Sequence, residues 1–426
     1  MKKLMKYFYI LMAAILVFST AGCHLFTDNV EAKSNHPRET NPIVEQKDWQ
    51  EFISGNHKFT LDLYQELIKS QENLFFSPYS ISSALAMTYG GARTTTEEQM
   101  AQVLQTSLTQ ERYHAAFNKL DQSLASREKT AGEDEKDAFQ LKIANALWGQ
   151  KDFPFLTDYL DMLAENYGAG MQLVDFVNSP DPSRIKINDW VADQTKNKIK
   201  DLLPEGSINP LTRLVLTNAI YFKASWLNQF SPNATHKDLF TLLDGSTVDV
   251  NMMSREAGMR YASGEGYQLV SIPYSGSQVS MLIFLPAEGK FSEFEAGITV
   301  DKLEGMIRAM KYSQVDLSLP KFKLETKFEA ADQLISLGMV DAFDPNKADF
   351  SGMDGKKDLY ISNVYHQAFV DVNEEGTEAA AATGLVVMQT SLPVDVVEMN
   401  VNRPFIFLIY DQETESILFM GRILKP

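Results

Sequence analysis

The chain has 426 residues, of which 44% are hydrophobic and 22% are charged, and this composition excludes a disordered or collagen-like protein. Its 56 acidic and 39 basic side chains give a net charge of −17, which argues against nucleic acid as a partner because backbone phosphates would be repelled. The single cysteine, Cys23, excludes an intrachain disulfide and a cysteine-ligated metal site.

The first 22 residues have the features of an export signal. Three lysines precede an apolar run over 8–18, and small residues follow it up to Cys23. The run is too short to span a membrane. Gly22-Cys23 resembles the end of a bacterial lipobox, with Thr20 where Leu is usual, which implies lipidation of the Cys23 thiol. We expect a cell-envelope lipoprotein at the outer membrane or cell surface; the alternative is an ordinary signal peptide on a secreted protein.

The rest of the chain is expected to form a tether and one domain. Residues 23–47 show no apolar periodicity, so we expect them to be a flexible tether behind the lipid-anchored cysteine. Residues 48–426 contain no low-complexity linker and no repeat, which indicates one domain. A domain of this length exceeds the usual limit for a single core, so it needs a large sheet with helices around it.

The first half of the domain is predicted to be mainly helical and the second half to consist of strands. Apolar residues recur every four positions over 59–68, a helix is expected from Pro78 to Gly90, and another over 185–203. The segments predicted as strands are 279–285, 315–322, 405–410 and 417–424, the last two forming a hairpin. Helices first and strands later indicate an α+β fold.

The sequence shows no signature of a catalytic or metal site. It has no G-x-S-x-G elbow, H-E-x-x-H motif, Walker loop or dinucleotide fingerprint, and its six histidines are scattered. The segment from Asp344 begins like a calcium loop, but Asp349 and Gly355 stand where Gly and Glu are required, so we interpret it as a turn. We therefore expect no enzyme activity, no cofactor and no metal.

The most informative segment is residues 368–387. Its four consecutive alanines favour a helix in isolation, but strand-forming residues flank them on both sides. The whole segment is therefore a potential long strand with a middle of small side chains. Side chains alternate in a strand, so six small or apolar residues would face inward: Thr377, Ala379, Ala381, Thr383, Leu385 and Val387. Such a segment is suited to entering a sheet between two existing strands.

Four motifs in chain order resemble the serpin family, and the resemblance covers about 50–426. They are 73–87 (NLFFSPYSISSALAM), 216–226 (LTNAIYFKASW), the hinge 374–384 (EEGTEAAAATG) and 401–407 (VNRPFIF), with 418–422 (LFMGR) after the last. The resemblance implies three β-sheets, eight or nine helices and an exposed reactive-centre loop over about 374–398. It also implies suicide inhibition, in which the cleaved loop inserts into the central sheet and traps a serine or papain-like cysteine protease as an acyl-enzyme.

The resemblance also implies roles for single residues. Glu374 would be the first hinge residue, paired with Lys321 to hold the loop out, and Thr377 would insert first. The other hinge residues are Gly376, Ala379 and Ala381. A polar shutter beneath the opening sheet would consist of Ser77, Ser80, Asn218 and His366, and Trp226 matches the buried tryptophan near the top of the sheet.

The family spacing places the reactive bond between Thr390 and Ser391, with Met388 or Gln389 as alternatives for the P1 residue. No Lys or Arg lies between Glu378 and Asn402, so a trypsin-like pocket has no cation to bind. We expect elastase-like or subtilisin-like targets, and papain-like ones as a further class, for a monomeric inhibitor. The alternatives are a non-inhibitory serpin, acting as a carrier, chaperone or storage protein, and an exported hydrolase, which lacks its nucleophile motif.

Overall fold

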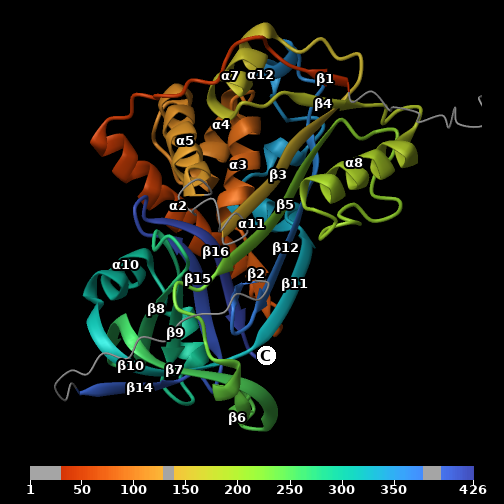
Figure 1. The fold of residues 1–426 in the computed structure, drawn as a ribbon. Helices are drawn as coiled ribbons and strands as arrows, with labels where there is room; N and C mark the ends of the chain where they lie inside the picture. Colours follow the sequence, from red (N-terminus) through yellow and green to blue (C-terminus); the bar gives the residue numbers. More distant parts are fainter. Residues whose placement is uncertain (1–29, 128–138, 378–394) are drawn as a thin grey trace, which may run out of the picture. The chain divides into compact units, whose positions relative to one another are not determined.

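The computed structural model of the chain describes residues 30–127, 139–377 and 395–426. The chain divides into two compact units, Met1–Val30 and Glu31–Pro426, and the fold described below is that of the second. Figure 1 colours its helices and strands along the sequence, with the helical first half in red to yellow and most strands in green to blue. The described helices include none that is long and apolar enough to cross a membrane.

Ten α-helices lie within the described residues, slightly more than the eight or nine expected. They are α2 (Gln46–Leu67), α3 (Pro78–Tyr89), α4 (Thr94–Val103), α5 (Gln110–Ala125), α7 (Thr157–Tyr167), α8 (Pro180–Gln194), α9 (Phe291–Ala296), α10 (Val300–Ala309), α11 (Ala331–Leu337) and α12 (Ser351–Asp354), with 3-10 turns η2 (Pro232–Ala234) and η3 (Asp341–Phe343). Helix α3 begins as predicted: Pro78 occupies its first turn and the Ser77 hydroxyl accepts the Ser80 N–H. Helix α8 ends before 203 because Lys196 and Asn197 adopt positive φ.

Seven strands form the central sheet, in the order β1-β4-β3-β5-β13-β12-β11. Their bounds are β1 (Val30–Ala32), β3 (Phe139–Gln150), β4 (Met171–Val174), β5 (Leu214–Ser225), β11 (Phe322–Glu329), β12 (Ile361–Val372) and β13 (Gly376–Thr377). Strands β5 and β12 run parallel side by side (Figure 1). Strand β13 lies between them at one end. This arrangement in the middle of the sheet positions the candidate site.

The remaining nine strands form one second sheet, in the order β14-β10-β7-β8-β9-β15-β16-β2, with β6 paired to β7 beside this path. Their bounds are β2 (Leu74–Phe76), β6 (His236–Thr241), β7 (Thr247–Gly264), β8 (Tyr267–Pro273), β9 (Val279–Pro286), β10 (Lys311–Pro320), β14 (Val396–Asn400), β15 (Phe405–Asp411) and β16 (Ser416–Ile423). Residues 247–261 of β7 pair with β6 and β10, whereas 260–264 pair with β8. The long strand β7 thus joins two groups of strands into one sheet, so the described strands form two hydrogen-bonded sheets where three were expected. Strands β15 and β16 form the predicted hairpin.

One predicted strand is in fact two. The alternating segment 315–322 crosses from β10 into β11, which belong to different sheets. Lys321 lies at this junction, where its backbone N–H donates to Asn251 O rather than to a partner in the central sheet. Alternation of side chains continues through such a corner, so the sequence pattern does not reveal it.

Apolar cores cover both faces of the central sheet. Along β5, Leu216, Ile220 and Phe222 belong to the larger core beneath α3, while Val215 and Ala219 face a smaller core beneath α8. Separation of β5 from β12 therefore disturbs the packing on both faces.

The tether prediction is wrong for residues 31–47. Residues 31–45 pack against α5 and α7, and α2 begins at Gln46. Arg38 forms a 2.6 Å ion pair with Asp121, and Ser34 donates to Asp161. Polar side-chain contacts hold most of this segment, with the pairing of β1 to β4 and only Ala32 and Val44 packed against the core, which is why it shows no apolar periodicity. The signal peptide and Cys23 lie outside the described residues.

Candidate functional site

The candidate site is an opening between the two central strands of the sheet. Strands β5 and β12 pair in parallel from Leu214↔Ile361 to Tyr221↔Phe369. Beyond this point β13 separates them, antiparallel to both, with Thr377 opposite Val372 on one side and Ala224 on the other. The first residues of the loop segment are therefore already inside the sheet.

The first inserted residues fit this position closely. The Thr377 side chain is 0% exposed, and its hydroxyl forms a 2.8 Å hydrogen bond with the Tyr274 hydroxyl. A Cβ at Gly376 would lie 2.1 Å from Ala224 O, so only glycine permits this approach of the two backbones. The sequence predicted Thr377 to insert first, and the structure places it in the sheet before any cleavage.

Glu374 and Lys321, which the sequence predicted as partners, are in contact. The Lys321 ammonium donates to Glu374 Oε2 at 2.7 Å, and the Thr235 hydroxyl donates to Oε1 at 2.8 Å. Burial opposes ionisation of Glu374, but these hydrogen bonds outweigh it and lower the pKa of the carboxyl below its ordinary value. The ion pair thus ties the start of the hinge to the corner between β10 and β11.

Trp226 and Tyr274 form a stacked pair beside the inserted hinge. Their ring centroids are 4.6 Å apart with an interplanar angle of 10°. Trp226 donates its backbone N–H to Glu375 O and its indole N–H to Asn373 O, each at 2.9 Å. The position of Trp226 was expected from the family resemblance. Tyr274 was missed, because it follows β8 in a turn and only the tertiary fold brings it to Thr377.

A buried polar pair joins β5 to β12 below the opening. Asn218 and His366 are register partners, and His366 Nδ1 contacts Asn218 Oδ1. The other imidazole nitrogen, Nε2, accepts the Ser77 N–H at 3.2 Å, so the proton lies on Nδ1 and is donated to Asn218. Burial lowers the pKa of His366 to about 3, which keeps the ring neutral.

The network extends from this pair into α3 and β3. The Asn218 amide donates to Ser80 Oγ at 2.7 Å and to Asn145 Oδ1 at 2.8 Å, and Ser80 Oγ also donates to Asn145 Oδ1. The Ser77 hydroxyl donates to Leu418 O at 2.7 Å. All four predicted shutter residues therefore meet. Asn145 was missed, because only the fold shows that this residue of β3 lies opposite Asn218.

Several predicted site residues lie outside the described residues. They are the hinge residues Ala379 and Ala381, the reactive-bond residues Thr390 and Ser391, the alternatives Met388 and Gln389, and the lipidation residue Cys23. The described ends of the loop are anchored in different sheets, by β13 in the central sheet and by β14 in parallel pairing with β10. In the described ranges no group of three or more His, Cys, Asp and Glu side chains is arranged to hold a metal ion.

Comparison with known proteins gives consistent matches along the chain. The family model described as serpin (serine protease inhibitor) matches residues 54–426. Serpin B3 of Homo sapiens is 40% identical over 385 residues, covering 87% of this chain and 98% of that protein. An uncharacterized serpin-like protein of Thermococcus kodakarensis is 36% identical and covers 98% of both chains. Among solved structures, the native state of the thermophilic serpin tengpin has a TM-score of 0.79 at 32% identity, covering 93% of this chain and 98% of that one.

Proposed function

The chain belongs to the serpin family, whose members are typically protease inhibitors rather than enzymes, and we propose that it is a suicide inhibitor that traps its target by loop insertion. The observation that carries the proposal is the position of β13. Gly376 and Thr377 lie between β5 and β12, which pair in parallel below them. Each further loop residue that enters replaces part of this parallel pair with two antiparallel ladders, and antiparallel pairing is the more stable.

The proposed reaction begins as ordinary proteolysis. The nucleophile of the protease attacks the P1 carbonyl of the loop, the peptide bond breaks, and the new amine leaves with the C-terminal segment. The ester or thioester then connects the protease to the loop segment that begins at β13. Insertion of this segment between β5 and β12 carries the protease along and distorts its active site before water can hydrolyse the bond.

The buried hydrogen bonds between β5, β12 and α3 oppose the separation of β5 from β12 that insertion requires. Asn218 and His366 bridge the strands that must separate, and Ser77 and Ser80 hold the pair to α3. These side chains are buried, so breaking their hydrogen bonds without replacement costs about 1–3 kcal/mol for each group left unpaired. The sheet therefore stays closed until the loop is cut and free to supply new strand partners.

The hinge favours inhibition over the non-inhibitory alternative of a carrier, chaperone or storage protein. Gly376 and Thr377 are accommodated in the sheet without a charged or bulky side chain, and small residues follow them in the sequence. We further propose elastase-like or subtilisin-like targets, with papain-like proteases as a second class, because the loop offers no Lys or Arg to an acidic S1 pocket. The inhibitor would act as a monomer, exported and anchored through Cys23.

The test is incubation of the full chain with elastase-like, subtilisin-like, papain-like and trypsin-like proteases, followed by denaturing electrophoresis. We expect a denaturant-resistant complex with the first two classes and none with trypsin. Mass spectrometry of the C-terminal fragment should find its first residue at Ser391 or within two residues of it. The proposal fails if every protease that cuts the loop leaves without forming a complex.

A further inference from the structure

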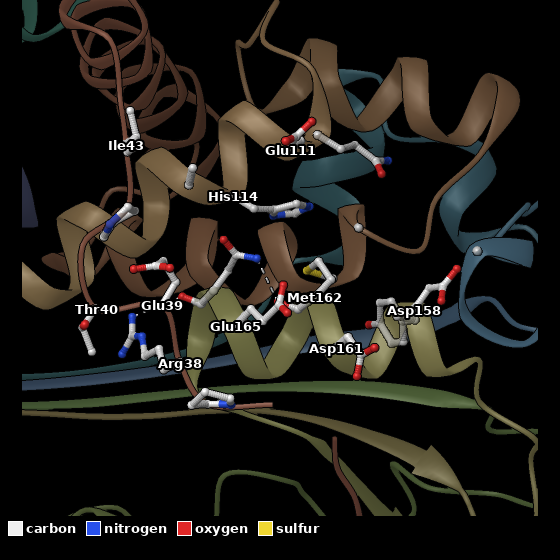
Figure 2. Close-up of a pocket in the computed structure, with 18 of the residues that line it drawn as sticks. Arg38, Glu39, Thr40, Ile43, Glu111, His114, Asp158, Asp161, Met162 and Glu165 are labelled. Carbon is white, nitrogen blue, oxygen red and sulfur yellow. Dashed lines mark hydrogen bonds between the residues drawn. The ribbon is translucent and has the colours of Figure 1, made fainter. Parts of the chain in front are cut away.

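A cavity of about 910 Å³ lies between the N-terminal segment 37–43 and helices α5 and α7, away from the residues of the hinge and shutter. Figure 2 shows its wall, with side chains of α7 facing those of α5 and Arg38, Glu39, Thr40 and Ile43 on the segment that crosses between them. Gly90, the residue after α3, completes the lining beside α5. The volume is in the range of sites that hold a drug-sized molecule or a short peptide.

The cavity contains a buried imidazole with an unused nitrogen. His114 of α5 is 2% exposed, and its Nε2 has no hydrogen-bond partner among the described residues. A Cβ at Gly90 would lie 2.2 Å from Met162 Cε and 3.1 Å from this nitrogen, so the flexible end of the Met162 side chain fills the space that Gly90 leaves beside the ring and has to move for a ligand to reach Nε2. Figure 2 shows the ring directed into the space between α5 and α7, beside Met162.

The hydrogen bond on the other side of the ring identifies the unused nitrogen as a donor. Tyr167 OH lies 2.7 Å from His114 Nδ1, and in the described part of the chain this hydroxyl meets no other acceptor. The hydroxyl therefore donates to Nδ1, and the ring proton lies on Nε2. Burial lowers the pKa of His114 to about 3, so the ring stays neutral. A buried N–H without an acceptor is costly, and a ligand oxygen would satisfy it.

The charges around the cavity favour a cation. Five carboxylates line it, on Glu39, Glu111, Asp158, Asp161 and Glu165, against two guanidinium groups, on Arg38 and Arg93.

The two guanidinium groups are already engaged. Arg38 pairs with Asp121, while Arg93 donates to the carbonyls of Gly90 and Ala92. By contrast, the exposed carboxylates of Asp158 and Glu111 make no hydrogen bond or ion pair with any described residue. Low-dielectric walls lined by one sign of charge raise the local concentration of the opposite charge.

We propose that this cavity binds a short basic peptide. A Lys or Arg side chain of the peptide lies between Glu111 and Asp158, and one backbone carbonyl accepts the His114 Nε2 proton. Ile43, which is 95% exposed at the edge of the cavity, offers an apolar contact to the peptide. Peptides combine these features, because each residue carries a carbonyl acceptor while Lys and Arg supply the cation.

Isothermal titration calorimetry of the full chain tests the proposal, with the capped peptide acetyl-Lys-Leu-Lys-amide as the probe and acetyl-Glu-Leu-Glu-amide as its control. We expect saturable one-to-one binding of the basic peptide and none of the acidic one. The double variant Glu111→Gln, Asp158→Asn should weaken binding about tenfold. A matched pair of exposed acids elsewhere, Glu265→Gln and Asp301→Asn, should leave it unchanged.

A second set of variants in the same experiment tests the role of the His114 imidazole. His114→Phe removes the donor and keeps the ring volume, and we expect roughly tenfold weaker binding. Gly90→Ala places a Cβ 2.2 Å from Met162 Cε and 3.1 Å from Nε2, so it crowds both groups and should weaken binding independently of any loss of the imidazole. Equal loss in the matched surface pair, a stoichiometry above one, or unchanged binding by the Glu111/Asp158 variant would show that the peptide binds the acidic surface at large and would overturn the proposal.

Discussion

Replacement of Thr377 by arginine is the sharpest test of loop insertion. The side chain is fully buried between β5 and β12, and its hydroxyl bonds to Tyr274, whose ring packs on Trp226 and Phe222. Loss of this hydrogen bond costs about 1 kcal/mol. Moving an unpaired guanidinium into this aromatic surrounding costs at least several kcal/mol more, because arginine does not deprotonate to avoid burial.

The expected effect is on the competition between insertion and deacylation. Because Thr377 already lies in the sheet, arginine is expected to expel β13 from it in the uncleaved chain, and the same burial cost then opposes its entry when the loop inserts. If only about 3 kcal/mol of this cost appears in the barrier to insertion, insertion slows about a hundredfold, since each 1.4 kcal/mol is about a factor of ten in rate. Thr377→Arg should then be cleaved at the same bond and released as a substrate. The assay is the stoichiometry of inhibition against an elastase-like enzyme, with complex and cleaved chain quantified on denaturing gels.

Two conservative variants provide the controls for this prediction. Thr377→Ser keeps the hydroxyl and should inhibit like the natural chain, whereas Thr377→Val removes only the bond to Tyr274 and should raise the stoichiometry slightly. Complex formation by Thr377→Arg at the natural stoichiometry would refute the argument that this residue must enter the sheet.

Three further predictions follow from the same site. Cleavage of the loop should raise the midpoint of thermal unfolding by roughly tens of degrees, because the loop then pairs fully with the sheet, and an unchanged midpoint in calorimetry would favour a non-inhibitory serpin. The folded-state pKa of His366, about 3, lies below the ordinary 6.5, so stability should be full above pH 6.5 and fall by up to about 1.4 kcal/mol per pH unit towards pH 3, with a smaller slope in His366→Gln. Thr390→Arg should add trypsin to the trapped proteases without changing the unfolding midpoint; trapping of trypsin by the natural chain would mean that the reactive bond is misplaced.

Helices and strands whose ends are determined by neighbouring residues could be predicted from the sequence alone. Pro78 and the Ser77 cap define the start of α3, and the apolar runs of β15 and β16 identify their hairpin. The corner at Lys321 and the packing of residues 31–45 were not predictable in this way. The first lies within an unbroken alternation of side chains, and the second is held by dispersed polar contacts.

The residues of the site also fall into two groups, those that sequence motifs identified and those that only the fold brings to the site. The family motifs identified Glu374, Lys321, Asn218 and His366, and the structure brings each pair into contact. Tyr274 and Asn145 required the three-dimensional fold. Their roles depend on register and on a turn that returns to the hinge, and neither has a periodic signal in the sequence.

The location of β14, β15 and β16 on the C-terminal side of the loop determines what happens to the inhibitor after use. Both hairpin strands are buried along their entire length, and β14 keeps five register pairs with β10. A cut in the loop therefore produces two polypeptides that stay associated as one particle, since with Cys23 as the only cysteine no disulfide is needed or available. Under the proposed mechanism each molecule would be consumed by one encounter with a protease, so the inhibitory capacity would be set by the number of uncut molecules.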